Sequence, residues 1–310
     1  MKIYIEYNIT NAPHGGGNQF LRGLREEFLR LGYYSETAEN ADIILFNSHH
    51  NCDAISHMKK IYPGKIFVHR LDGPMRLYNN MHDNRDDIVY SLNEQIADAT
   101  IFQNHWSRNK NLELGLKDNK RYVIIGNAVD SRIFNYKSLT EENKKNKIRI
   151  ISSSFSKNYR KGHKFYEFLD THLDFKKYEY VFAGNSPVNY KNINLLGCLD
   201  SHTLASELKK SDLYITASEN DPCSNSLLEA IACGLKILAL NSGGHPELVK
   251  NRNNLFNNEE ELLTKITQYG IINNVFNSPP IQRIATLYLN FFGDLLNGKE
   301  IMYRAVDSLS

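Results

Sequence analysis

The stretch SENDPCSNSLLEAIACG, Ser218 to Gly234, lies between two short apolar runs, DLYITA (212–217) and KILAL (236–240). It opens with polar residues and continues with apolar ones. It also carries two carboxylates, Asp221 and Glu229, separated by seven residues. Short apolar runs on either side of an amphipathic segment are typical of a strand–helix–strand unit in a parallel sheet. The stretch therefore predicts a helix between two buried strands.

Asp221 and Pro222 predict the start of this helix, because Asp is a preferred N-cap and Pro is favoured at the first helical position. The backbone amides of the first turn, at Ser224, Asn225 and Ser226, then have no partner within the helix. They also lie at the positive end of the helix dipole. These amides predict an anion-binding site at the end of the preceding strand.

Glu229 lies on the polar side of the predicted helix, opposite the apolar arc of Leu227, Ala230 and Ile231. Periodicity alone makes it a solvated glutamate on an exposed helix face. Glu229 lies there among small and polar residues, two turns from the predicted anion site, and periodicity does not exclude a functional role.

Strand and helix signals alternate along the whole chain of 310 residues. Strand-like runs such as KIYIEYNI (2–9) and ADIILFN (41–47) enclose helix-like runs such as NQFLRGLREEFLRLG (18–32). This alternation predicts an α/β fold with two doubly wound parallel-sheet (Rossmann-like) domains that face a cleft.

One polar and charged segment, 138–147, has no apolar periodicity, and we interpret it as the linker between the domains rather than as a basic arm. The N-terminal domain is then 1–137, completed by the C-terminal helix within 281–310. The C-terminal domain is 148–275.

Composition excludes several classes of protein. Hydrophobic residues make up 41% of the chain and charged residues 23%, as in ordinary globular proteins, and the net charge of +2 argues against a nucleic-acid partner. The four cysteines form no Cys-x-x-Cys pair. We predict no metal site, although His49 and His50 are adjacent. The N-terminus lacks the apolar core of a signal peptide, which predicts a cytoplasmic protein; peripheral membrane contact through the C-terminal helix is the alternative to its packing on the protein.

The run 218–249 resembles the signature of glycosyltransferase family 4, the retaining sugar transferases of GT-B fold. That family carries an acid, seven residues, then Glu-Ala, a small-residue turn, a strand and a Gly-Gly-x-Pro-Glu loop. The corresponding residues here are Asp221, Glu229-Ala230, Cys233-Gly234, KILAL and Gly243-Gly244-His245-Pro246-Glu247. The segments HGGG (14–17), IIGNAVDSRIF (124–134) and FSKNYRKG (155–162) are similar to other segments of the same family.

The resemblance implies roles in donor binding. It makes Glu229 the ligand of the nucleotide ribose and Lys161 the residue that neutralises the diphosphate leaving group, with Arg160 beside it. Asp221 stands where the family usually has Glu, and it either contacts the donor sugar or only caps the helix. Ser156 stands where the family has Arg.

The resemblance also implies roles outside this helix. A glycine-rich loop, Gly15, Gly16 and Gly17, approaches a phosphate or the sugar. His69 faces the transferred sugar and is counted with Asp221 and Lys161 as catalytic. The resemblance also implies that the backbone at Cys198 contacts the base of the nucleotide. It further implies that Asp72 and Arg76 face the acceptor.

The function implied is that of a retaining glycosyltransferase in glycan biosynthesis. It moves a sugar from a nucleotide sugar of UDP or GDP type to a hydroxyl of a saccharide, with no tightly bound cofactor and no metal. The alternatives are a non-catalytic nucleotide- or sugar-binding protein of the same fold and a nucleotide-sugar epimerase. The sequence assigns neither the sugar, the base, the acceptor nor the oligomeric state.

Overall fold

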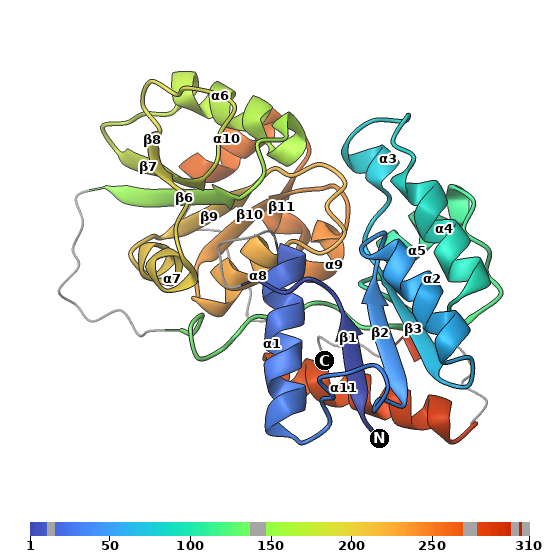
Figure 1. Ribbon diagram of the computed structural model, residues 1–310. Helices are drawn as coiled ribbons and strands as arrows, with labels where there is room; N and C mark the ends of the chain where they lie inside the picture. Colours follow the sequence, from blue (N-terminus) through green and yellow to red (C-terminus); the bar gives the residue numbers. More distant parts are fainter. Residues whose placement is uncertain (11–15, 137–146, 269–277, 299–303, 306–310) are drawn as a thin grey trace. The chain divides into compact units, whose positions relative to one another are not determined.

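A computed structural model of the protein describes residues 1–10, 16–136, 147–268 and 278–298 and the backbone of 304–305 (Figure 1). The chain forms two compact units. Unit 1 comprises Met1–Thr10, Gly17–Ala128 and Pro279–Ser310, and unit 2 comprises Asn11–Gly16 and Val129–Ser278. The predicted linker lies outside the described residues except for Lys147.

Unit 1 is built on a parallel sheet with the strand order β1-β2-β3-β4-β5-β12. Its strands are β1 (Ile3–Glu6), β2 (Ile43–Asn47), β3 (Ile66–Leu71), β4 (Ala99–Phe102), β5 (Arg121–Ile124) and β12 (Arg304–Ala305). Its helices are α1 (Gly16–Arg30), α2 (Cys52–Ile61), α3 (Met75–Tyr78), α4 (Arg85–Gln95), α5 (His105–Glu113) and α11 (Ile281–Leu296).

Helices cover both faces of this sheet, which is why a strand such as β2 is buried along its whole length. In β2, Ile43 and Leu45 enter the core beneath α1 and α11, whereas Ile44 and Phe46 enter a second core with Ile55 of α2. Successive side chains of a strand point to opposite faces, so a continuous apolar run suits a sheet that is buried on both sides.

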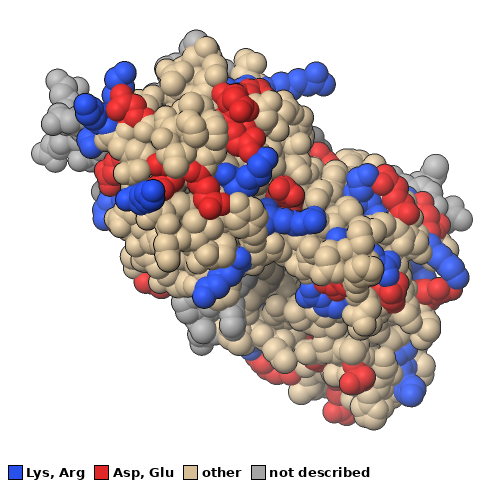
Figure 2. Space-filling view, turned by 90° about the horizontal axis from the view of Figure 1, so that it is seen from above, with Lys and Arg blue, Asp and Glu red and all other residues tan. Residues whose placement is uncertain are grey.

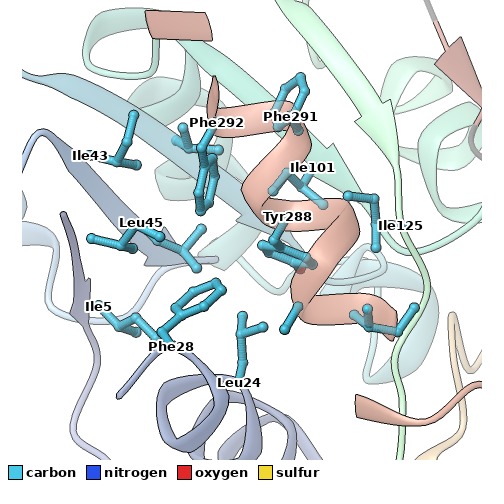
Figure 3. Packing of buried hydrophobic residues seen from close by; sticks show 14 of the residues in the cluster. Ile5, Leu24, Phe28, Ile43, Leu45, Ile101, Ile125, Tyr288, Phe291 and Phe292 are labelled. Carbon is cyan, nitrogen blue, oxygen red and sulfur yellow. The ribbon is translucent and has the colours of Figure 1, made fainter. Parts of the chain in front are cut away.

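The apolar side of α11 is part of the unit 1 core (Figure 3). Phe292 lies against Phe28 of α1, with 6.3 Å between ring centroids, and Tyr288 lies 6.1 Å from Phe20. Figure 3 shows Tyr288 and Phe292 directed toward the side chains of β1 and β2. This side of α11 is therefore covered by the protein's own core and is not a free membrane-binding surface.

Unit 2 is built on a second parallel sheet, with the strand order β11-β10-β9-β6-β7-β8. Its strands are β6 (Ile148–Ser154), β7 (Tyr178–Gly184), β8 (Asn194–Gly197), β9 (Leu213–Thr216), β10 (Lys236–Leu240) and β11 (Leu255–Phe256). Its helices are the 3₁₀ turns η1 (Tyr159–Lys161) and η2 (Arg252–Asn254), and α6 (His163–His172), α7 (Ser201–Lys209), α8 (Asn225–Ala232), α9 (His245–Val249) and α10 (Glu259–Thr267).

Two cores enclose this second sheet as well. One packs against α7 and α8 and includes Leu227 and Ile231, and the other packs against α6 and α10 and includes Tyr166 and Leu262. The predicted class, two α/β units that each have a parallel sheet covered on both faces, is confirmed.

Charged side chains of both signs are interspersed on the face of the molecule drawn in Figure 2. Among its described residues this face carries no broad area of Lys and Arg.

Candidate functional site

The carboxyl ends of β6 and β9 mark the point in unit 2 where the strand order reverses. The chain adds β7 and β8 on one side of β6, and β9, β10 and β11 on the other. Parallel sheets leave a crevice at such a point, where ligands commonly bind. The turn after β6 carries Lys161 and the turn after β9 carries Asp221, so both side chains lie at this place.

Lys161 and Asp221 form an ion pair, with 2.8 Å between Nζ and Oδ2 and side chains that are 19% and 10% exposed. Gly162 makes the approach of the two turns possible. Its φ of +99° belongs to the left-handed region, and a Cβ there would lie 2.6 Å from the Cβ of Ala217. A side chain at this position would thus force η1 away from the end of β9.

Asp221 does not cap α8, contrary to the sequence prediction. The helix begins at Asn225, and its N-cap is Ser224, whose Oγ accepts from the amide of Leu227 at 3.4 Å. The carboxylate of Asp221 instead accepts from Lys161 and from the amide of Cys223. The turn 221–223 thus holds Asp221 in the ion pair with Lys161, and Pro222 lies before the helix rather than at its first position.

The charge of Asp221 is stabilised within a buried site. Burial raises the pKa of this carboxyl, but the Lys161 ammonium, together with the Cys223 amide, outweighs it, so that the pKa lies below its usual range. The loop after β10 closes over the turn: the Gly244 amide donates to the Asp221 carbonyl at 2.8 Å. A carboxylate held in this way stays ionised at neutral pH.

Glu229 lies one helical turn after the start of α8. Its pKa is shifted in the opposite direction from that of Asp221. It is half-buried, and burial raises the pKa of its carboxyl to about 8. Within the described ranges, no side chain or backbone amide donates a hydrogen bond to this carboxylate. Glu229 is thus a partly desolvated carboxyl, to which no described residue donates a hydrogen bond, rather than a fully solvated glutamate.

His245 is a polar residue of this region that the sequence analysis did not single out. It is fully buried, and its Nδ1 donates to the Leu240 carbonyl at 2.9 Å. Its Nε2 has no partner in the part of the chain that the structure describes. Burial lowers the pKa of His245 although Asp221 opposes this effect, so the ring is neutral. The signal was available, because His245 fills the variable position of the Gly-Gly-x-Pro-Glu segment.

The start of α8, where the sequence predicts an anion site, carries polar residues. Asn225 and Ser226 are half-buried residues of its first turn, and the hydroxyls of Ser224 and Ser226 lie 3.1 Å apart. Arg160 is half-buried on η1 beside Lys161, and its carbonyl accepts from the Glu219 amide at 2.8 Å. These residues surround the Lys161–Asp221 pair within unit 2.

Of the other predicted positions, Cys198 stands apart from this cluster, whereas Gly16 lies against it: a Cβ at Gly16 would lie 2.0 Å from Nδ2 of Asn225. Cys198 is exposed after the edge strand β8, which β7 separates from β6. Gly16 and Gly17 open α1 instead of forming a loop before it, and Gly15 lies outside the described residues.

His69, predicted to face the transferred sugar, is fully buried within β3 of unit 1. Its ring stacks on Phe46 at 4.3 Å. Nε2 contacts the Ser48 carbonyl at 2.9 Å and Nδ1 the side-chain amide of Asn93 at 3.3 Å. Burial lowers the pKa of His69 to about 4. With both ring nitrogens engaged, His69 holds the sheet and its neighbouring turn together, and we leave it out of the proposed reaction.

The two predicted acceptor residues of unit 1 differ in setting. Asp72 follows β3 and pairs with the fully buried Arg70 at 3.0 Å, and its side chain remains 24% exposed. Arg76, on α3, pairs with Asp87 at 2.6 Å. Asp72 therefore belongs to a polar cluster at the strand ends, whereas Arg76 belongs to a surface ion pair between α3 and α4.

Neither a metal centre nor a membrane span emerges from the described residues. They contain no group of three or more His, Cys, Asp or Glu side chains that could hold a metal ion. No helix in the same ranges is long and apolar enough to cross a membrane.

Comparisons with known proteins agree with the resemblance seen in the sequence. Residues 188–269 match the family model for glycosyl transferases group 1. Curated protein sequences give no match. Sucrose-phosphate synthase from Thermosynechococcus elongatus has a similar structure, with a TM-score of 0.76 and 12% identity over 96% of this chain and 100% of that chain.

Two further solved structures are similar at lower scores. The E. coli trehalose-6-phosphate structure with bound UDP-2-fluoro glucose has a TM-score of 0.62 and 11% identity over 98% of this chain and 100% of that chain. A trehalose-6-phosphate synthase structure has a TM-score of 0.59 and 13% identity, covering 92% of this chain and 77% of that chain. The resemblance is confirmed: residues 188–269 match the glycosyl transferases group 1 model, and the chain has the GT-B fold of the similar structures.

Proposed function

We propose that the protein is a nucleotide-sugar-dependent glycosyltransferase that transfers a sugar, with retention, to a hydroxyl of a saccharide acceptor. The observation that carries this proposal is the desolvated carboxyl of Glu229, to which no residue of the described ranges donates a hydrogen bond, on the helix that follows the turn of the Lys161–Asp221 pair. A helix that carries a desolvated carboxyl, and whose start follows the turn of an ion-paired ammonium, suits a ligand with both hydroxyls and phosphates.

Glu229 would bind the ribose of the donor. A carboxylate accepts a hydrogen bond at each oxygen, so it matches the two adjacent hydroxyls of a ribose. Those two hydroxyls would supply the donors that the described residues do not provide. Binding would favour the ionised form of Glu229 and lower its pKa from about 8.

Lys161 would bind the diphosphate, and Asp221 would hold the Lys161 side chain in position. An ammonium has three N–H donors, so Lys161 can keep its bond to Asp221 and still donate to a phosphate oxygen. The amides of Asn225 and Ser226 and the positive end of the α8 dipole would add to this stabilisation. Asp221 in this proposal acts through Lys161, and its contact with the donor sugar stays a prediction.

The reaction would break the bond between the anomeric carbon and the diphosphate oxygen, and the electron pair would leave with the diphosphate. The acceptor hydroxyl would form the new bond on the same face of the sugar, and its proton would pass to an oxygen of the departing phosphate. Lys161 and the start of α8 would stabilise the charge that grows on the leaving group, which is the kind of electrostatic effect that lowers such barriers most.

Titration calorimetry with UDP and GDP, followed by an assay of donor consumption, tests the proposal. We expect Glu229→Ala to weaken binding of the preferred nucleotide at least tenfold, about 1.4 kcal/mol. We expect Lys161→Ala to lower turnover more than tenfold, an increase in barrier above about 1.4 kcal/mol.

Matched controls are Glu260→Ala and Lys176→Ala, which remove exposed side chains of the same unit. Wild-type binding and turnover in both site variants would refute the proposal. Nucleotide binding without turnover of any donor would instead favour the non-catalytic binding protein.

A further inference from the structure

A row of hydroxyl groups runs from the sheet of unit 2 to the start of α8. It comprises Ser153 of β6, Tyr214 of β9, Ser226 in the first turn of α8 and Ser224, the N-cap; we call it the hydroxyl row. The Ser153 and Tyr214 hydroxyls lie 3.2 Å apart, and those of Ser226 and Ser224 lie 3.1 Å apart. A hydrogen bond between the Ser226 hydroxyl and the Tyr214 phenol joins the two pairs.

The register of the sheet places Tyr214 beneath the helix. Tyr214 is the partner of Ile151 on β6, and Ser153 lies two residues further along the same strand, so all three side chains point to one face. This is the face that α7 and α8 cover, since Ile151 and Tyr214 share a core with Leu227 of α8. The phenol therefore lies between the sheet and α8.

The hydroxyl of Tyr214 is a costly group at this place. The side chain is fully buried, and a hydroxyl that leaves water lowers stability unless it is hydrogen-bonded. Phe would fill nearly the same volume of this core without that cost. The partners of the phenol, Ser153 and Ser226, are only half-buried. The buried phenol is thus bonded to hydroxyls that a ligand can reach.

The hydroxyl row lies next to both parts of the proposed donor site. Burial and, to a smaller extent, the charge of Glu229 raise the pKa of the Tyr214 phenol, so the phenol keeps its proton and can donate it to a hydrogen bond. The first turn of α8 follows the turn in which Asp221 pairs with Lys161. The row therefore connects the region assigned to the ribose with the region assigned to the diphosphate.

The direction of the protons in the row decides what it can bind. Each hydroxyl has one proton to donate and can also accept. If the phenol donates to Ser226, the Ser226 proton is directed away from Tyr214, to Ser224 or to a ligand. An anion at the start of α8 favours this direction, because in the opposite one oxygen lone pairs would face its negative charge. Hydrogen bonds that point the same way polarise one another, so the phenol strengthens Ser226 as a donor.

We propose that Tyr214 is a positioning residue of the donor site, which directs the Ser226 hydroxyl proton toward a phosphate oxygen of the diphosphate. Tyr214 is fully buried and acts through Ser226, whose hydroxyl makes the contact. This inference rests on the proposed function for the identity of the ligand, and on unit 2 alone for the hydroxyl row.

Titration calorimetry on the full chain with pyrophosphate, UDP, GDP, uridine and guanosine tests this inference. Tyr214→Phe keeps the ring and removes the hydroxyl. In this variant the Kd of pyrophosphate and of the preferred nucleoside diphosphate should rise by about fivefold or more, because a hydrogen bond to a charged group is weakened. The Kd of the matching nucleoside should stay the same, because it carries no phosphate. A general disturbance of the site would weaken both.

Ser226→Ala should give the same selective loss, and the double variant should bind no more weakly than Ser226→Ala, since the two hydroxyls act as one unit. Tyr180→Phe is the matched control. Tyr180 is as deeply buried, and its hydroxyl lies 2.7 Å from that of Ser152 in the core on the other face of the sheet. This variant should bind every probe as the wild type does, and circular dichroism checks that all variants fold.

Four results would each overturn the inference: a wild type that binds none of the probes with phosphates, unchanged phosphate binding in Tyr214→Phe, equal losses for nucleoside and nucleoside diphosphate, and additive losses in the double variant. Failure of the proposed function has a different signature, because it would appear as nucleotide binding that does not depend on Glu229. Pyrophosphate binding that depends on both Tyr214 and Ser226 would still support the role of the hydroxyl row in that case.

Discussion

The carboxylate of Glu229 should reduce the stability of the folded protein at neutral pH, because burial disfavours its charged form. Its pKa is about 8 in the folded state against an ordinary value of 4.5. Between these two values the folded state holds one proton more than the unfolded state, so stability falls as the pH rises. If Glu229 binds the donor as proposed, the site costs stability, a combination that is common in enzymes.

The variant Glu229→Gln should therefore be more stable than the wild type, by an amount that grows with pH. Gln has the same shape and no proton to lose, so the difference in free energy of unfolding should increase by about 1.4 kcal/mol per pH unit between about pH 5 and pH 8. Urea unfolding at pH 5, 6, 7 and 8 measures this difference.

Glu260→Gln on α10 is the control, since its side chain is exposed. A stability difference between Glu229→Gln and the wild type that is the same at every pH would contradict the assigned burial of Glu229. The same variant should bind nucleotide more weakly, so that stability and binding change in opposite directions.

At the scale of single elements, α11 contributes one of its sides to the hydrophobic core of unit 1. Its buried residues are Ile281, Ile284, Ala285, Tyr288, Phe291, Phe292 and Leu295. They recur at intervals of three and four, as expected for a helix that lies on a sheet. The helix is thus part of the fold of unit 1, although 152 residues of sequence separate its first residue from Val129, where the chain enters unit 2.

Phe292→Ala should lower the free energy of unfolding by about 3–5 kcal/mol, because it removes a fully buried ring and leaves a cavity beside Phe28. Thermal and urea unfolding measure the loss. Leu296→Ala is the matched control on the same helix, since Leu296 is 42% exposed and should cost less than about 1 kcal/mol. Similar losses in the two variants would contradict the packing of α11 described above.

At the scale of the whole molecule, binding of a nucleotide should stabilise the folded chain. A ligand that binds only the folded state adds about 2.7 kcal/mol when its concentration is 100 times its Kd. The melting temperature should rise with the concentration of the preferred nucleotide in the wild type. In Glu229→Ala the rise should require at least tenfold more nucleotide, and an equal rise in both proteins would argue against the donor site on α8.

The fold could be predicted from sequence because its signals are local. Continuous apolar strands such as ADIILFN and amphipathic helices such as 18–32 alternate, and that alternation alone requires parallel sheets with both faces covered. The order of strands follows less directly, because it depends on where along the chain new strands start to be added at the opposite edge of the sheet.

The site was harder to predict because its contacts join residues that are distant in sequence. Asp221 has the sequence signals of an N-cap, but α8 begins at Asn225 and is capped by Ser224. The carboxylate of Asp221 instead accepts from Lys161, 60 residues away. His69 ends the apolar run KIFVH, yet β3 continues to Leu71 and buries it.

Unit 2 is inserted into unit 1, between Ala128 and Pro279. A ribosome therefore releases the whole of unit 2 before it releases α11. At roughly 5–20 residues per second, the insertion of about 150 residues delays the arrival of α11 by about 8–30 s. During that interval β1, β2 and β4 have been synthesised, but the apolar face that includes Leu45 and Ile101 lacks part of its cover. The nascent chain consequently presents an apolar surface to chaperones for longer than a chain whose domains follow one another in sequence.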